Sequence, residues 1–375
     1  MKRDGNVKLL GASSFFNDIG SDMIAPLLPF YISSLGGGGI ALGLIAGMRD
    51  GLSSLFKIFG GWISDKIGKR KIFVFLGYLT SIIFRALLLV AGSWQQVVAF
   101  VSFERFGKSR DAPRDAIIED STKKTGRAFA FQQMLDTTGG VIGIILVIFL
   151  FWKFNFGISK IILIASLISV LSLIPLFFVK EPRFKKTHKN LFKGISSLSS
   201  SLKYFVFVSG IFALGNFGFY IFLIARGEEL SGSVIYSLIM YALFSAFYAF
   251  TAVPFGKLSD KIGRKKVLIL GYVLFLFISI GFIFVKNVYL FTIFFSLYGI
   301  VYAITQPTSR ALIADFSKEL KGTAMGFYYF VTGIAAIPAG LVAGILWNIS
   351  AETMFAAVAG VALLSLVLLF FIKEK

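Results

Sequence analysis

The chain has no cysteine and only one histidine, and both absences restrict its chemistry. Without cysteine it forms no disulfide, so the sequence carries no sign of the redox state of its compartment. Soft metals need thiolate or imidazole ligands, and His188 is the one candidate. We therefore predict no metal centre and no cofactor. Asp18, Asp22 and Asp136 leave open the alternative that a hard cation binds through carboxylate oxygens.

Charged residues are also scarce, at 15% of the chain, whereas hydrophobic residues make up 57% and the mean hydropathy is +0.83. A soluble domain of 375 residues does not need so much apolar surface. The 44 phenylalanines are typical of helices that face lipid. The composition therefore predicts a membrane protein in contact with membrane lipids.

The formal net charge of +19 does not indicate nucleic-acid binding. Such binding gathers lysine and arginine on one polar face, with aromatic residues interleaved, and no stretch of this chain has that pattern. The basic residues instead cluster in alternate connections between apolar runs. This alternation is the positive-inside pattern, so we predict a multi-pass protein of the cell membrane with both termini in the cytoplasm.

Twelve apolar runs reach the length of about 20 residues that a helix needs to cross the hydrocarbon. Asp18 and Asp22 interrupt the first run, and no small-residue cleavage site follows, so we expect it to stay as a helix rather than act as a signal peptide. The predicted fold is all-α and polytopic, with two pseudosymmetric six-helix bundles at 1–179 and 204–375 joined by a cytoplasmic linker at 180–203. The expected spans are 9–35, 40–61, 72–92, 94–118, 126–151, 159–179, 204–225, 233–256, 267–285, 288–312, 322–347 and 351–372.

A short basic loop occurs twice, at 61–71 and at 256–266, with its glycines and its aspartate repeated at one offset. Such a repeat at half the chain length is the mark of two copies of one membrane unit, as in many transporters. We call these two segments the repeated loop. Its candidate functional residues are Gly61, Asp65, Gly68, Lys69 and Arg70 in the first copy, and Gly256, Asp260, Gly263, Arg264 and Lys265 in the second.

The repeated loop resembles the pattern Gly-x-x-x-Asp-x-x-Gly-Arg-Arg/Lys of the major facilitator superfamily, with Lys69 replacing the first arginine in the first copy. Residues 15–29, 104–108, 112–116, 126–129 and 136–140 are further similar to an efflux-type branch of that superfamily. The fifth helix departs from the antiporter pattern, because Ile144 stands where Gly-x-x-x-Gly-Pro would place proline. The resemblance implies a small-molecule carrier that works by alternating access, with no enzymatic activity.

In the superfamily this loop controls opening at the cytoplasmic side, and Asp65 and Asp260 match its acid. An aspartate suits this gating role, because its carboxylate can face the positive N-terminal end of a neighbouring helix. A generic positive-inside loop is the alternative, but it explains the lysines and not the repeated glycines and aspartate. We expect Arg114, Asp115, Glu119 and Asp120, at the predicted cytoplasmic end, to form solvated or gate-side ion pairs.

Charged side chains inside the predicted spans are the second group of candidate functional residues. One charge near the bilayer centre costs about 2.5 kcal/mol or more, so it usually marks function or a buried ion pair. The two aspartates of the first span stand four positions apart, so they share a helix face, and one of them can keep its proton. The candidates for proton coupling or substrate binding are Asp18, Asp22, Arg49, Asp50, Arg85, Glu104, Arg105 and Asp136.

The alternative is structural: each acid would pair with Arg49, Arg85 or Arg105 and hold the bundle together. Glu104 and Arg105 are adjacent and should point about 100° apart, so we predict that they do not pair with each other. In the superfamily a fourth-helix arginine is often tied to proton transfer, and Arg105 is the nearest match.

These observations predict a proton-coupled secondary transporter that is monomeric and exports rather than imports. Its substrate is expected to be a small organic molecule, amphipathic or cationic because the predicted cavity is acidic and has aromatic walls. The first alternative is a facilitated or symport carrier of a polar metabolite. A non-transporting membrane receptor is the alternative from another class. An enzyme would need a catalytic motif such as Gly-x-Ser-x-Gly, and none is present.

Overall fold

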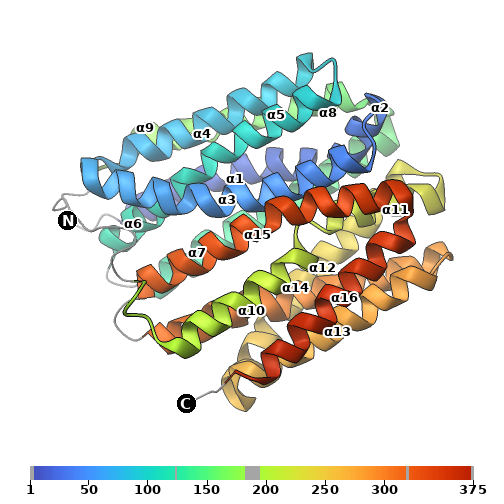
Figure 1. The fold of residues 1–375 in the computed structure, drawn as a ribbon. Helices are drawn as coiled ribbons and strands as arrows, with labels where there is room; N and C mark the ends of the chain where they lie inside the picture. The colour runs from blue at the N-terminus through green and yellow to red at the C-terminus, as the bar shows by residue number, and fades with distance from the viewer. Residues whose placement is uncertain (1–3, 123–124, 182–194, 318–320, 373–375) are drawn as a thin grey trace. The chain divides into compact units, whose positions relative to one another are not determined.

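A computed structural model describes residues 4–122, 125–181, 195–317 and 321–372, and these ranges contain helices and no strand. Most of the predicted linker, as well as the side chain of Asp65, lies outside the described part. The helices confirm the predicted all-α fold with twelve membrane-crossing segments (Figure 1).

The first six segments are built from nine α-helices and three short 3-10 turns. Proline explains the break in the first segment, because Pro26 lies in the turn that separates α1 from α2. The elements are α1 (Asp4–Ile24), η1 (Ala25–Leu27), α2 (Leu28–Ser34), α3 (Gly39–Ile67), α4 (Arg70–Leu87), η2 (Leu88–Val90), α5 (Trp94–Glu104), η3 (Arg105–Arg110), α6 (Asp111–Ser121), α7 (Thr125–Phe154), α8 (Ile158–Val170) and α9 (Leu173–Phe178).

The later six segments contain fewer separate helices, since only one of these segments is interrupted. The elements are α10 (Ser200–Asn216), α11 (Tyr220–Ser231), α12 (Val234–Ile262), α13 (Arg264–Phe284), α14 (Val288–Ser317), α15 (Lys321–Ile349) and α16 (Ala351–Phe370). The interruption falls between α10 and α11, where residues 217–219 leave the helical hydrogen-bond ladder.

The chain divides into two compact units, which are described separately. Unit 1 holds Met1–Gly36 and Leu52–Lys189, and unit 2 holds Gly37–Gly51 and Asn190–Lys375. The first half of α3 therefore packs with the later helices, and its second half packs with the earlier ones.

The outer surfaces of the helices are apolar. Phe250 is 81% exposed, Phe284 75% and Trp152 71%, which is unfavourable in water and suits contact with lipid tails. Nine helical segments in the described residues are long and apolar enough to cross a membrane by composition alone. The segments that fall short are α1 to α2, α3, and α5 to α6, and these three carry most of the predicted intramembrane charges.

Unit 1 has its core where α1, α4, α6, α7 and α9 meet. Small residues bring α7 against α1: a side chain at Gly139 or Gly143 would collide with backbone oxygens of Phe15 or Ile19. The Gly-x-x-x-Gly spacing on α7 therefore allows close helix packing. Buried apolar residues fill the remaining space: Val7, Leu10, Val74, Tyr78, Ile117, Ile118, Ala128, Leu176 and Val179.

The core of unit 2 is aromatic and is centred on the break between α10 and α11. Phe219, at the break, makes edge-to-face contacts with Phe275, Tyr298 and Phe355. The Tyr298 hydroxyl donates to Asn216 Oδ1 at 2.5 Å, which gives the side chain of the last α10 residue a hydrogen-bond partner. Contacts between aromatic rings therefore stabilise the break, where the backbone hydrogen bonds of the helix are interrupted.

Glycines allow the first half of α3 to lie directly against α15 inside unit 2. A Cβ added at Gly43 would collide with the carbonyl oxygen of Gly340, whereas one at Gly360 on α16 would meet nothing. We predict that Gly43→Ala lowers stability by about 1–3 kcal/mol, because backbone atoms must shift to admit the methyl group. Thermal unfolding of the purified protein checks this prediction. Gly360→Ala is the matched control, and equal melting temperatures for the two variants would contradict the packing.

Candidate functional site

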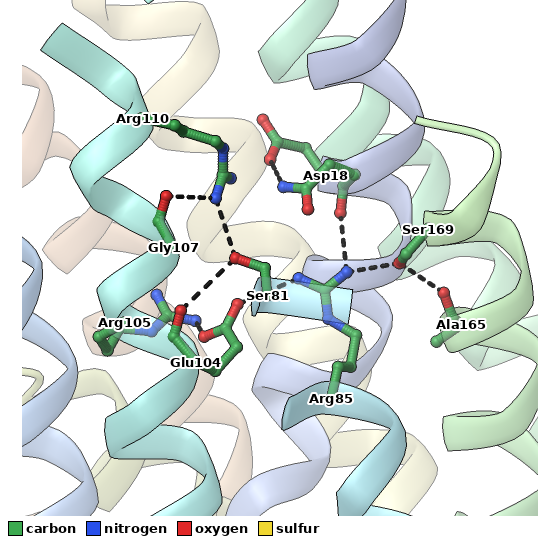
Figure 2. Close-up of polar contacts among 10 residues, drawn as sticks. Asp18, Ser81, Arg85, Glu104, Arg105, Gly107, Arg110, Ala165 and Ser169 are labelled. Atoms are coloured by element: carbon green, nitrogen blue, oxygen red, sulfur yellow. Dashed lines mark hydrogen bonds and ion pairs between the residues drawn. The ribbon is translucent and has the colours of Figure 1, made fainter. Parts of the chain in front are cut away.

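Three predicted charges of unit 1 meet in one buried network between α4, α5 and η3. Arg85 Nη2 donates to Glu104 Oε1 at 3.1 Å, and Arg105 pairs with the other oxygen of the same carboxylate. The side chains of all three are at least nine-tenths buried. Glu104 thus offsets part of the charge of two arginines, which alone would be costly to bury. Figure 2 shows the carboxylate of Glu104 between the two guanidinium groups.

The prediction that Glu104 and Arg105 do not pair is wrong. It rested on the directions of the Cα–Cβ bonds in a regular α-helix, but α5 ends at Glu104 and a 3-10 turn begins at Arg105. The arginine side chain is also long enough to curl back onto its neighbour, which the direction of its first bond does not reveal.

Arg85 is held by polar groups from two further helices. Its Nη1 donates to the backbone oxygen of Asn17 on α1 at 3.4 Å and to the hydroxyl of Ser169 on α8. The Ser169 hydroxyl in turn donates to the Ala165 carbonyl at 2.6 Å (Figure 2). The predicted third-span arginine therefore links four helices of unit 1 and acts as a fixed part of its interior.

A third buried arginine, Arg110, lies at the end of η3. Its Nη1 donates to Ser81 Oγ at 2.9 Å and to the Gly107 carbonyl at 2.8 Å, and its guanidinium lies 4.2 Å from the ring centroid of Tyr78. The Tyr78 hydroxyl is 2.7 Å from Ser14 Oγ on α1. A cation on a ring face in a dry interior is a favourable contact.

Asp136 on α7 belongs to a second group of polar side chains, which is more exposed than the network around Glu104. Its Oδ1 accepts a hydrogen bond from Gln132 Nε2 at 2.7 Å, and its Oδ2 lies 3.8 Å from Arg114 Nη1. Arg114 also pairs with Asp115 at 2.9 Å. Arg114 is not solvated, because its side chain is 13% exposed and reaches the α7 carboxylate, whereas a gate-side role for this residue stays a prediction.

The two aspartates of α1 lie on the same helix as predicted, since α1 continues past both. Asp18 Oδ1 accepts from Asn17 Nδ2 at 2.9 Å. Asp22 packs directly against Gly140 of α7, where any side chain larger than hydrogen would collide with its carboxylate. Both aspartates are half-buried. The negative charges of Asp18 and Asp136 also act on each other electrostatically.

Asp50 and Arg49 belong to unit 2, apart from the charges just described. Asp50 Oδ2 accepts from the backbone N–H of Gly218 at 2.8 Å, at the break before α11. Adjacent residues on α3 point about 100° apart, so Arg49 projects from another face of the helix. Of the eight candidate charged residues, Arg49 and Asp50 thus fall in unit 2 and the other six in unit 1.

The first copy of the repeated loop makes a tight turn at Gly68, whose φ of +78° favours glycine. Arg70 Nη1 then pairs with Asp120 of α6 at 2.6 Å, and Lys71 Nζ donates to the Phe177 carbonyl at 2.9 Å. The Glu181 carboxylate accepts from the backbone N–H groups of Arg70 and Lys71, both at 2.8 Å. An acid at a helix N-terminus complements its unpaired N–H groups.

The second copy repeats these contacts with a change of register. Gly263, with φ +100°, comes directly before α13, and Arg264 pairs with both Asp260 and Asp315. Lys265 Nζ donates to the carbonyl of Phe370 at 2.8 Å. Arg264 therefore corresponds in its contacts to Arg70. If the two copies are aligned at Gly68 and Gly263, Arg264 is matched to Lys69 instead. The first copy therefore has one additional residue after its glycine, and the counterpart of Arg264 is Arg70 and not Lys69.

The two arginines differ in burial, which gives a prediction. The Arg70 side chain is 10% exposed and that of Arg264 is 25% exposed. Arg70→Ala should lower the free energy of unfolding more than Arg264→Ala, because the better buried Arg70 side chain loses packing contacts as well as its pair with the exposed Asp120. The more open Arg264 pairs should contribute no more than about 1 kcal/mol. Thermal unfolding of the two variants checks the order, and a larger loss for Arg264→Ala would contradict it.

Sequence reasoning missed several residues that complete the unit 1 site. Arg110 and Gln132 carry no repeat or spacing that marks them as buried, and Ser169 and Tyr78 read as ordinary residues of apolar helices. Their roles depend on which helices become neighbours. Among the described residues no cluster of three or more metal-ligating side chains occurs.

The fold and site define a class: a polytopic helical transporter with internal charges and a repeated basic loop. The chain belongs to the Major Facilitator Superfamily, whose model matches residues 10–226 and again 205–375.

Relatives agree with this family. An uncharacterized MFS-type transporter of Methanocaldococcus jannaschii, MJ1317, is 44% identical over 98% of this chain and 94% of its own length. The multidrug resistance protein MdtH of Blochmanniella pennsylvanica is 24% identical over 91% of this chain and 85% of its own. The crystal structure of a mutant of the nucleoside transporter NupG has the same fold, with a TM-score of 0.84 at 12% identity over 98% of this chain and 100% of that one.

Proposed function

We propose that this chain is a proton-coupled secondary transporter that exports a small organic molecule by alternating access. It would lie in the cell membrane as a monomer, with both termini in the cytoplasm and no enzymatic step. The two six-helix bundles would be residues 1–179 and 204–375, as the repeat offset indicates. The low-identity likeness to a multidrug resistance protein supports the efflux direction.

The observation that carries the proposal is the contrast between two kinds of carboxylate in unit 1. Glu104 is buried and paired with two arginines, so its carboxylate already has fixed partners on both sides. Asp18, Asp22 and Asp136 are half-buried, and the atoms of the ion pair between Asp136 and Arg114 are 3.8 Å apart. A carboxylate of this second kind can gain and lose a proton without breaking the bundle.

The repeated loop would supply the gate. Its ion pairs join α4 to α6 in unit 1 and α13 to α12 and α14 in unit 2, all at the ends of helices. Partly exposed pairs of this kind contribute little stability, so they can break and reform at low cost as the helices move. A loop that served only to set topology would not need matched arginine contacts in both halves.

The experiment that tests the proposal uses the purified protein in liposomes with a pH-sensitive dye inside. A panel of amphipathic cations and neutral metabolites is added, and proton movement is recorded beside tracer movement of each compound. The proposal expects at least one compound to move protons in the direction opposite to its own. Compounds that move as tracers without any proton movement would make the protein a uniporter and overturn the coupling.

A further inference from the structure

Two buried amide side chains of unit 1 have only part of their hydrogen bonds satisfied. Asn17 is 1% exposed and Gln132 is 3% exposed. Asn17 Nδ2 donates to Asp18 Oδ1 at 2.9 Å (Figure 2), and Gln132 Nε2 donates to Asp136 Oδ1 at 2.7 Å. The carbonyl oxygens of both amides are buried and have no hydrogen-bond partner among the residues that the structure describes. Such an acceptor costs free energy, so its occurrence twice beside a carboxylate needs an explanation.

The amides differ in chemistry from the groups that hold Glu104. A guanidinium group has only donors, so Arg85 and Arg105 suit a carboxylate in its charged form. A side-chain amide has an NH2 group that donates and a carbonyl oxygen that accepts, attached to the same carbon. It can therefore donate to a charged carboxylate and, after half a rotation about its last bond, accept from a protonated one.

Burial does not prevent this rotation. The NH2 group and the oxygen of an amide are nearly the same size, and the terminal torsion of asparagine or glutamine has a broad energy profile. Gln132 lies where α7 meets Gly11 of α1, and a Cβ added at Gly11 would be 3.6 Å from its Oε1. A half rotation exchanges the two groups without needing more space. In either orientation one group bonds the aspartate and the other is left over, so this cost does not favour one form.

Charged groups of both signs act on Asp136 from the elements packed around it. Arg114 on α6 lies 3.8 Å away, and Lys108 on η3 and Asp18 on α1 act on it electrostatically. Asp22 lies further along α1, against Gly140 of α7. The two cations favour the charged form of Asp136, whereas the aspartates favour the protonated form. Gln132 differs from all of them because it offers a hydrogen bond to either form.

Asp18 has comparable surroundings on α1. The titratable groups that act on it electrostatically are Tyr78 and Arg85 on α4, Lys108 on η3 and Asp136 on α7. Arg85 Nη1 also donates to the backbone oxygen of Asn17 at 3.4 Å. This bond holds the backbone of Asn17 in place without using its side-chain amide, so the amide can rotate while α1 stays fixed.

We propose that Gln132 and Asn17 rotate their amide groups when Asp136 and Asp18 take up a proton, so that each aspartate keeps a hydrogen bond in both forms. In the charged form an amide N–H donates to Oδ1 of the carboxylate. In the protonated form the carboxylic O–H donates to the amide carbonyl oxygen. The proton comes from water and no other covalent bond changes. Gln132 and Asn17 are thus positioning residues, and the inference rests on the proposed function only in taking this proton to be the coupled one.

Infrared spectroscopy tests the rotation on the purified full-length protein, with glutamine isotope-labelled at the side-chain carbonyl carbon. A carbonyl that begins to accept a hydrogen bond absorbs at lower frequency. The wild type should show one labelled carbonyl band that moves to lower frequency on acidification. The shift should be lost in Asp136→Asn and in Gln132→Met. It should be kept in Gln133→Met, the matched control, because Gln133 is exposed and bonds Thr137 across the same four-residue spacing.

Labelled asparagine tests Asn17 in the same way, with Asp18→Ala in place of Asp136→Asn. The wild-type spectrum and the aspartate variants carry the test even if Gln132→Met fails to fold. A labelled band that stays in place while the carboxylic acid band of Asp136 appears would overturn the inference and leave Gln132 as a donor only. Failure of that acid band to appear at any pH at which the protein is folded would also overturn it.

This measurement uses neither substrate nor a pH gradient, so it is separate from the test of the proposed function. A wild type that shows the labelled shift but moves substrate without protons would refute proton coupling and support the amide rotation. Coupled transport by a protein whose labelled band does not respond to pH would refute the rotation alone.

Discussion

Glu104→Ala is expected to destabilise the protein by about 3–5 kcal/mol, the range seen when one partner of a buried ion pair is removed. The substitution leaves the guanidinium groups of Arg85 and Arg105 without the carboxylate that lies between them. For a unit of this size such a loss lowers the melting temperature by about 6–20 °C. Thermal unfolding of the purified protein, followed by intrinsic fluorescence, measures the effect.

Two further variants decide what the network is for. Glu119→Ala, at an exposed position of α6, is the matched control and should melt with the wild type. The triple variant Arg85→Met, Glu104→Leu, Arg105→Met removes all three charges together and should regain most of the stability, as buried ion pairs often do when replaced by apolar residues. If Glu104→Ala melts within about 2 °C of Glu119→Ala, the claim that Glu104 compensates two buried arginines is contradicted.

Asp136→Asn is expected to abolish proton-driven transport while leaving substrate exchange intact. The amide keeps the size of the side chain and its bond to Gln132 but cannot take up a proton. Loss of a positioned proton-transfer group usually costs about 100-fold or more. Accumulation driven by a pH gradient and exchange between equal substrate concentrations are compared in liposomes.

The acids of α1 give the parallel tests. Asp18→Asn and Asp22→Asn should each reduce coupling, because both are half-buried carboxylates on α1, which packs directly against the Asp136 helix α7. Glu119→Gln is the control for loss of an exposed carboxylate. Coupling that survives in all three aspartate variants would move the proton site elsewhere and make these acids structural.

The fold followed from features that act locally along the chain. Apolar length, basic loops and the repeated glycines determine how many helices form and where they end, so the predicted spans agree with the helices to within a few residues. The break at Pro26 and the close packing at Gly139 and Gly143 have local causes of the same kind, because each follows from the residue itself.

The details of the site depended on tertiary neighbours that spacing does not reveal. The pairing of Glu104 with Arg105 required a change from α-helix to 3-10 turn, and nothing in the local sequence marks that change. Arg110 lies inside the predicted span 94–118 but was not among the candidate charges, and its burial against Tyr78 depends on which helix becomes its neighbour. Asp50 reads as one more charge of the first half, but the structure groups it with unit 2 and gives it Gly218 as a partner.

The most direct test of proton coupling is uphill accumulation in liposomes of the wild type and of Asp136→Asn, with substrate equal on both sides and a pH gradient imposed. The account predicts that the wild type concentrates the substrate against its own gradient, that the variant does not, and that both still exchange labelled substrate. Accumulation of the same size in both proteins, or none in the wild type despite rapid exchange, would contradict it.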